Sequence, residues 1–111
     1  MLWLLGCQQP EGATNAGEVL SRDPASLVYT KHARCRMNCR HIDESEVQEI
    51  LKQGRINHRK SEPAARPDPK YALEGTTHDG QHVRIVFAPA RRGTVVITVI
   101  DLDTEWDCHC R

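Results

Sequence analysis

The 111-residue sequence has few aromatic residues, no net charge and no long hydrophobic run. Lysine and arginine total 15 and aspartate and glutamate also total 15, whereas a strongly basic nucleic-acid-binding protein shows a clear positive excess. Aromatic residues make up only 5% of the chain, which leaves little surface on which bases could stack. No apolar run is long enough to span a bilayer. These absences argue against a nucleic-acid coat protein and against a transmembrane protein.

The residues that are present suit one small folded domain with a polarised charge distribution. The length predicts a single domain, and the 39% of hydrophobic residues can bury a modest core. Residues 31–40 are basic without an acidic residue, and residues 101–107 are acidic without a basic one. A local basic patch is therefore compatible with the zero net charge.

Residues 1–27 are expected to form a flexible tail, and residues 28–111 a single domain. The tail is rich in Gln, Gly, Asn and Ser and shows no periodicity. Its start, Leu4-Leu5-Gly6-Cys7, resembles a bacterial lipobox, in which the cysteine is lipidated after cleavage. A basic region ahead of it is missing, and the apolar stretch is shorter than that of a signal peptide. We expect a cytoplasmic protein, with an exported lipoprotein carrying a lipid on Cys7 as the alternative.

Two helices are predicted in the first half of the domain. Thr30 is a good N-cap for a helix over residues 31–40, which contains neither Gly nor Pro. Asp43 and Glu46 have the spacing of a capping box that starts a second helix, and Gly54 lies where this helix should end.

After Gly54 the hydrophobic period changes from helical to alternating. Strands are expected within residues 55–60, 70–77, 82–88 and 94–100, with Asp79-Gly80 marking a hairpin turn. The predicted fold class is therefore α+β, with two N-terminal helices packed on a three- to four-stranded antiparallel sheet.

The first helix carries a motif, His-Ala-x-x-Arg-Met-x-x-Arg-x-Ile from His32 to Ile42, that resembles a bacterial domain-of-unknown-function family of short proteins. The resemblance covers roughly residues 28–101 and extends more weakly into the strands. That family is distantly similar to small toxins of the RelE, ParE and BrnT type, many of which cleave RNA. The resemblance implies a toxin-like helix-helix-sheet fold, a metal-independent ribonuclease, RNA as substrate and a small antitoxin-like protein as partner.

His32, Arg36, Arg40 and Arg84 are the candidate catalytic residues. The first three match the family motif, and at i, i+4 and i+8 they share one helix face. A histidine can transfer protons near neutral pH, and an arginine can hold a phosphate oxygen and stabilise the charge of the transition state. Arg84 lies in a strand that matches the family's sheet. The alternative is a solvated face whose arginines pair with the acidic second helix or tail.

Four cysteines form two close pairs, Cys35 with Cys39 and Cys108 with Cys110. Each pair places its two sulfurs on one side of its segment, so four thiolates could bind zinc in a tetrahedral site. Disulfides within a pair fit relaxed geometry poorly, whereas bonds between the pairs would fasten the C-terminal tail to the first helix. Buried free thiols are the third alternative.

Two classes of function follow. One is a ribonuclease-like enzyme that uses His32 and Arg36, which the family resemblance favours. The other is a non-enzymatic interaction module held by zinc or by disulfides, which the zero charge and the low aromatic content favour.

Overall fold

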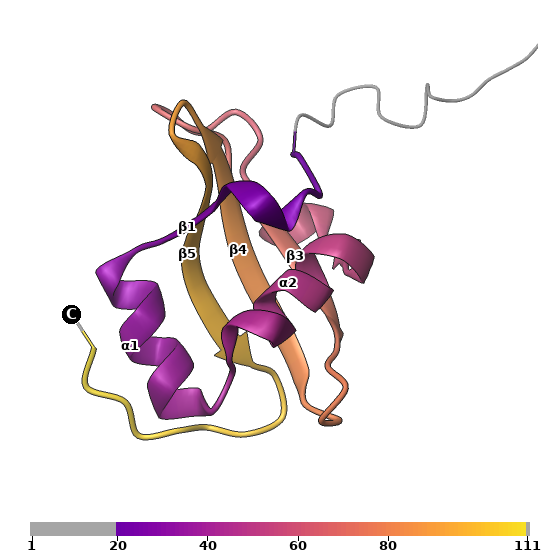
Figure 1. The fold of residues 1–111 in the computed structure, drawn as a ribbon, viewed down its shortest axis with the longest axis vertical. Helices are drawn as coiled ribbons and strands as arrows, with labels where there is room; N and C mark the ends of the chain where they lie inside the picture. Colours follow the sequence, from indigo (N-terminus) through magenta and orange to yellow (C-terminus); the bar gives the residue numbers. More distant parts are fainter. Residues whose placement is uncertain (1–19, 111) are drawn as a thin grey trace, which may run out of the picture.

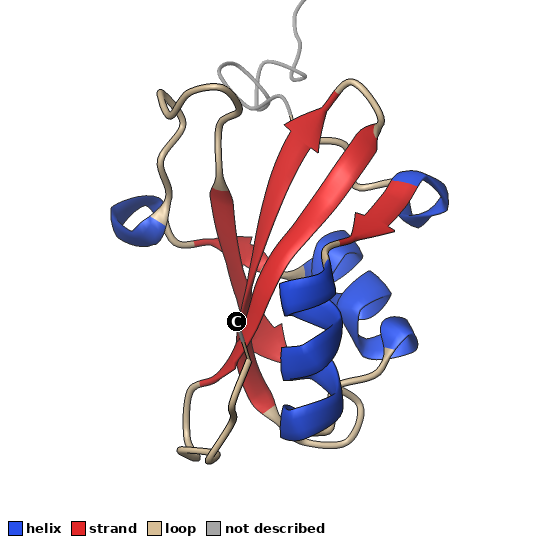
Figure 2. Ribbon diagram, turned by 90° about the vertical axis from the view of Figure 1, so that its left-hand side faces the viewer, coloured by secondary structure: helices blue, strands red, loops and turns tan. Residues whose placement is uncertain are grey.

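Five strands form one mixed sheet, and two helices lie on the same side of it in the computed structural model, which describes residues 20–110 (Figures 1 and 2). The helices are α1 (Lys31–Arg40) and α2 (Glu44–Gln53), and the short 3-10 turns are η1 (Pro24–Ser26) and η2 (His58–Lys60). The strands are β1 (Leu27–Tyr29), β2 (Arg55–Ile56), β3 (Tyr71–Thr76), β4 (His82–Ala90) and β5 (Gly93–Asp101). Among the described residues, no helix is long and apolar enough to cross a membrane.

Helix α1 begins and ends as its sequence predicts. The Thr30 hydroxyl accepts a hydrogen bond from the Ala33 backbone N–H at 2.9 Å and so caps the helix. Ala33 and Met37 are buried against the sheet, and the helix ends at His41 in the left-handed conformation. Because only two of its side chains are buried, α1 depends on other contacts to stay on the sheet.

Helix α2 has the capping box expected from Asp43 and Glu46. The Asp43 side chain accepts from the Glu46 N–H, and the Glu46 side chain accepts from the Asp43 N–H, each at 2.9 Å. An apolar stripe of Val47, Ile50 and Leu51 is buried. The spacing of these side chains makes α2 strongly amphipathic, so its apolar stripe faces the sheet.

The strand order is β1-β5-β4-β3-β2, and this corrects the expected sheet in two respects. The sheet has five strands, and β1 pairs in parallel with β5, whereas the remaining pairs are antiparallel. The helices also follow a strand instead of opening the domain. β1 has three residues, too few to show a hydrophobic period. It pairs with a strand far along the chain, where Leu27 lies opposite Thr94, 67 residues later.

The core lies between the helices and one face of the sheet. It combines the helix residues above with the strand residues Tyr71, Leu73, Val83, Ile85, Phe87, Val96 and Val99, and with Leu20 from the segment before η1. Side chains alternate along a strand except at the bulge at Val86/Phe87, so the residues between these core positions occupy the opposite face of the sheet, which we call the open face. Ala72 and Ala88 on this face are nevertheless buried, and Glu74, Arg84, Val86 and Thr98 are half-buried.

Candidate functional site

Helix α1 covers the part of the β5 edge that β1 leaves unpaired. β1 pairs with β5 only as far as Val96. Beyond that point the Thr30 hydroxyl donates to the Ile97 carbonyl at 3.3 Å, and the Arg40 guanidinium donates to the Val99 carbonyl. Unpaired strand edges invite association with other strands. Arg40 therefore protects this edge, which is a structural use for one of the four candidate catalytic residues.

His32 reaches the open face of the sheet around the same edge. Its Nε2 atom lies 3.4 Å from the Thr98 hydroxyl. Thr98 pairs with Val86 of β4, and Arg84 lies two residues before Val86 on the same face. The fold thus brings His32 and Arg84, which are 52 positions apart in sequence, to neighbouring rows of one surface.

Arg84 is held by an acidic partner that the sequence did not reveal. Its Nε donates to a Glu74 carboxylate oxygen at 2.7 Å, and the Asn57 amide donates to the same oxygen at 2.8 Å. The side chains of Arg84 and Glu74 are 20% and 25% exposed. Although burial raises the pKa of Glu74, the hydrogen bonds from Asn57 and Arg84 outweigh it and lower that pKa. Glu74 is therefore ionised and fixes the direction of the guanidinium.

Arg36 lies one turn after His32 on α1 and is half-buried. Its Nε atom is buried and has no hydrogen-bond partner among the described residues. Burial and, after it, the positive charge of Arg36 lower the pKa of Arg40, while the carboxylate of Asp101 raises it. A buried N–H without a partner is costly, and an anion would satisfy it.

The four paired cysteines form two disulfides, Cys35–Cys110 and Cys39–Cys108. These are the bonds between the pairs that the sequence left open, in place of the four-cysteine zinc site. A disulfide sulfur carries no thiolate charge, and thiolate is the form that binds zinc. The C-terminal tail is consequently fastened across α1.

The tail is also anchored where it leaves β5. The Trp106 indole N–H donates to the Asp101 carboxylate at 2.9 Å, and its ring lies 4.9 Å from that of His41. Gln81 donates to the same carboxylate at 2.9 Å. Burial raises the pKa of Asp101, but the hydrogen bonds from these two side chains and from two backbone N–H groups lower it to about 2. Asp101 therefore stays ionised and organises the start of the tail.

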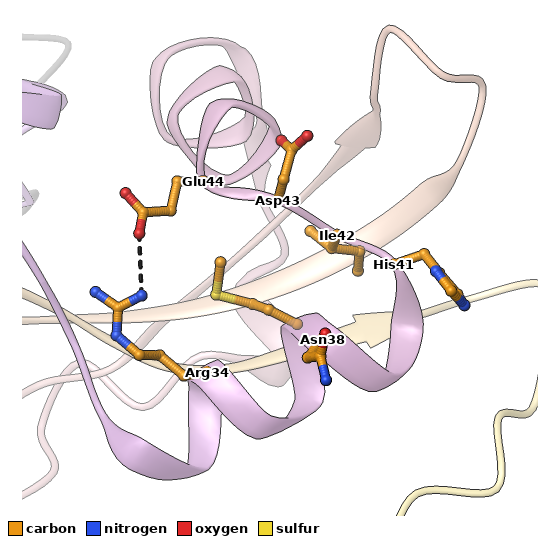
Figure 3. A pocket seen from close by; sticks show the side chains of 7 residues that line it. Arg34, Asn38, His41, Ile42, Asp43 and Glu44 are labelled. Carbon is orange, nitrogen blue, oxygen red and sulfur yellow. Dashed lines mark hydrogen bonds and ion pairs between the residues drawn. The ribbon is translucent and has the colours of Figure 1, made fainter.

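The basic residues of α1 pair less with the tail than their charges suggest. Arg34 forms an ion pair with Glu44 of α2 at 3.0 Å, and its guanidinium lies 4.6 Å from the centre of the Tyr29 ring. Figure 3 shows this pair at one end of a shallow groove between the two helices, lined by Arg34, Met37, Asn38, His41, Ile42, Asp43 and Glu44. An exposed ion pair of this kind contributes little stability, and the groove's lining does not bring a base beside a nucleophile.

The comparison with known families gives one match. The model of a domain of unknown function, DUF4258, matches residues 29–101. No curated protein and no solved structure matches the chain. The matched segment runs from the end of β1 to the end of β5 and includes α1, Arg84 and Thr98, whereas Cys108 and Cys110 lie beyond it. The chain therefore belongs to the DUF4258 family of domains of unknown function.

Proposed function

We propose that the open face of the sheet, together with the α1 residues at its edge, binds RNA and cleaves it without a metal ion. The observation that carries the proposal is the approach of His32 to Thr98, within 3.4 Å, beside the row that contains Arg84. A proton-transferring imidazole and a fixed guanidinium on one surface are the groups that phosphodiester cleavage through the 2′-hydroxyl needs.

The proposed roles follow from the environment of each side chain. His32 takes the proton of the ribose 2′-hydroxyl, whose oxygen attacks the phosphorus to form a 2′,3′-cyclic phosphate while the bond to the 5′-oxygen breaks and that oxygen takes a proton from water. Arg36, half-buried one turn along the same helix face, holds a phosphate oxygen. Arg84 stabilises the developing negative charge, and Glu74 positions it. Arg40 acts indirectly, because its guanidinium holds α1 on the Val99 carbonyl. The resemblance to RelE-type toxins supports the same direction, and a small antitoxin-like protein is the proposed partner.

The test is cleavage of a fluorescently labelled single-stranded RNA by the oxidised, full-length chain in the presence of EDTA. The wild-type chain should cut RNA and leave DNA of the same sequence intact, because DNA lacks the 2′-hydroxyl. His32→Ala should lose activity by about 10²–10⁴-fold, and Arg36→Ala by about 10²–10³-fold. His58→Ala, an exposed histidine in η2, is the matched control and should keep full activity. A wild-type chain without cleavage, or a His32→Ala chain as active as wild type, would refute the proposal.

A second candidate is a non-enzymatic interaction module, which the two disulfides favour. They hold the tail on α1 in one arrangement, and such bonds persist in oxidising compartments, which supports export. The lipid on Cys7 stays a proposal, because this residue lies outside the described residues. Hydrogen exchange tests the module: reduction should raise amide exchange in α1 and in residues 102–110 and leave β3 and β4 protected. Zinc binding by Cys35, Cys39, Cys108 and Cys110 stays a proposal for the reduced chain alone, measured as zinc per chain after reduction.

A further inference from the structure

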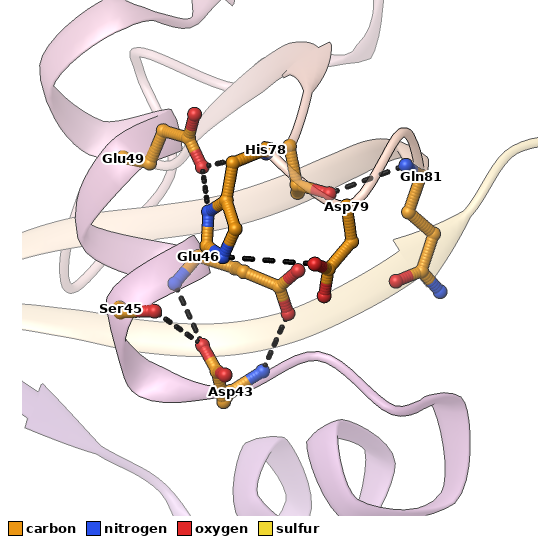
Figure 4. A network of polar contacts seen from close by, with 8 residues as sticks. Asp43, Ser45, Glu46, Glu49, His78, Asp79 and Gln81 are labelled. Carbon is orange, nitrogen blue, oxygen red and sulfur yellow. Dashed lines mark hydrogen bonds and ion pairs between the residues drawn. The ribbon is translucent and has the colours of Figure 1, made fainter.

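A second polar cluster lies away from the open face, where the first turn of α2 meets the turn between β3 and β4 (Figure 4). Glu46 comes from α2, and His78 and Asp79 come from the turn. One ligand atom from each of these three residues lies within 4.8 Å of the other two. The cluster therefore joins two segments that are more than 30 residues apart in sequence.

Glu46 is the buried member of the cluster, with 1% of its surface exposed. One carboxylate oxygen accepts from the Asp43 N–H in the capping box. The other oxygen is buried and has no hydrogen-bond partner among the described residues. In Figure 4 the carboxylate extends toward that of Asp79. A buried carboxylate oxygen beside a second carboxylate needs a cation or a proton to compensate it.

His78 has the orientation that a metal-binding histidine usually has. Its Nδ1 atom lies 3.0 Å from a Glu49 carboxylate oxygen, which also accepts from the His78 backbone N–H at 3.1 Å. Its Nε2 atom, on the opposite side of the ring, lies 3.7 Å from an Asp79 oxygen. A carboxylate on one ring nitrogen fixes the tautomer that leaves a lone pair on the other. Glu49 thus directs the lone pair of Nε2 into the cluster.

We propose that Glu46, His78 and Asp79 bind one divalent transition-metal ion, of which Zn²⁺ is the representative, and that Glu49 positions His78. Imidazole nitrogen and carboxylate oxygen are both zinc donors, and three protein ligands leave the fourth tetrahedral position to water. Mg²⁺ and Ca²⁺ favour sites made of oxygen atoms alone, so the histidine selects against them.

The three ligand atoms, now within 4.8 Å of one another, must move closer together to bind an ion. Zinc bonds of about 2.0–2.1 Å place tetrahedral ligand atoms about 3.4 Å apart, and the Nε2–Asp79 distance is 3.7 Å. The side chains of His78 and Asp79 are 55% and 62% exposed, so both can rotate toward the fixed oxygen of Glu46. The bound ion would tie the β3–β4 turn to α2, a role independent of the proposed cleavage of RNA.

The experiment is calorimetric titration of Zn²⁺ into the oxidised, full-length chain with Cys7 replaced by serine, so that the one cysteine outside the two disulfides does not compete. We expect one zinc ion per chain. His78→Ala and Asp79→Asn should each weaken binding by at least tenfold, and Glu49→Ala by about 10–100-fold. His82→Ala is the matched control, because this exposed histidine faces Asp103 outside the cluster, and it should bind as the parent does.

Glu46→Gln separates binding from folding, because glutamine can also accept the capping hydrogen bond from Asp43. The variant should keep its far-ultraviolet circular dichroism and lose zinc binding. Absence of saturable binding in the parent, or an unchanged affinity in His78→Ala, would overturn the proposal. A parent that binds no zinc, combined with a Glu46→Gln variant of higher melting temperature, would also overturn it. In that case a proton shared with Asp79 would explain the buried carboxylate.

Discussion

Removing the two disulfides together should cost far more stability than the sum of removing each one. The two bonds close nested loops, with sequence separations of 75 and 69 residues. In the chain-entropy description, a single cross-link of this span stabilises the folded state by about 4.5 kcal/mol at 25 °C. Once either bond is present, the other closes only a loop of the six residues by which the separations differ. It then adds about 2 kcal/mol.

The matched variants are Cys35→Ser with Cys110→Ser, Cys39→Ser with Cys108→Ser, and the chain with all four substitutions. Each double variant should lose about 2 kcal/mol of unfolding free energy and the fourfold variant about 6–7 kcal/mol. The coupling of about 2–3 kcal/mol comes from the unfolded state, which either bond alone already restricts.

The intact-protein mass should first verify that wild type has two disulfides and each double variant one. Urea denaturation of the four proteins then measures the differences in the free energy of unfolding. The slope of the free energy with urea should rise in the fourfold variant, because its unfolded chain exposes more surface. Strictly additive losses, or a fourfold variant as stable as the double variants, would refute the nested-loop reasoning.

Three further predictions concern single side chains and use the same denaturation assay. Arg40→Met should lower the free energy of unfolding by about 1–3 kcal/mol, because it leaves the Val99 carbonyl on the β5 edge without its donor. A much smaller loss would mean that water replaces the guanidinium as the donor. The pKa of Asp101 is about 2 in the folded chain against 3.8 ordinarily, so ionised Asp101 adds at most about 2 kcal/mol to the free energy of unfolding. This stabilisation is present above pH 4 and disappears as the pH falls toward 2. Asp101→Asn should therefore flatten that part of the stability–pH curve. Gly93 has φ +127° and a Cβ there would lie 2.3 Å from the Ser26 carbonyl oxygen, whereas Gly80 has φ +85° and open space. Gly80→Ala should therefore cost about 1 kcal/mol and Gly93→Ala clearly more, and equal losses would contradict the steric argument.

The helices were predictable because their signals are local. Thr30, the Asp43–Glu46 capping box and the apolar stripe of α2 each act within a few residues, and the structure has both helices as expected. β1 was not predictable in this way. Its three residues pair with a strand at the other end of the domain, and tertiary contacts decide such pairing.

The candidate sites show the same division between local and distant information. The family motif marked His32 and Arg36, but Glu74 emerged only when the register placed it opposite Arg84. The cysteine spacing allowed zinc or disulfides, and the folded path of the tail placed Cys108 and Cys110 on α1. The Glu46, His78 and Asp79 cluster likewise requires the β3–β4 turn to dock on α2, which no spacing in the sequence encodes.

The disulfides also restrict how the proposed functions combine. If the bonds form in the cell, the compartment is oxidising, and a cytoplasmic antitoxin would not meet the folded chain. Arg40 lines one hollow of the surface together with the tail residues Glu105, Trp106 and Asp107, so the fastened tail runs beside one end of the helix face that would hold phosphate. Reduction would therefore change access to that face as well as stability. The rate of RNA cleavage should accordingly be compared between the oxidised chain and the fourfold serine variant. Equal rates would mean that the tail stabilises the domain without shaping the site. A faster variant would mean that the tail restricts the entry of RNA to the site.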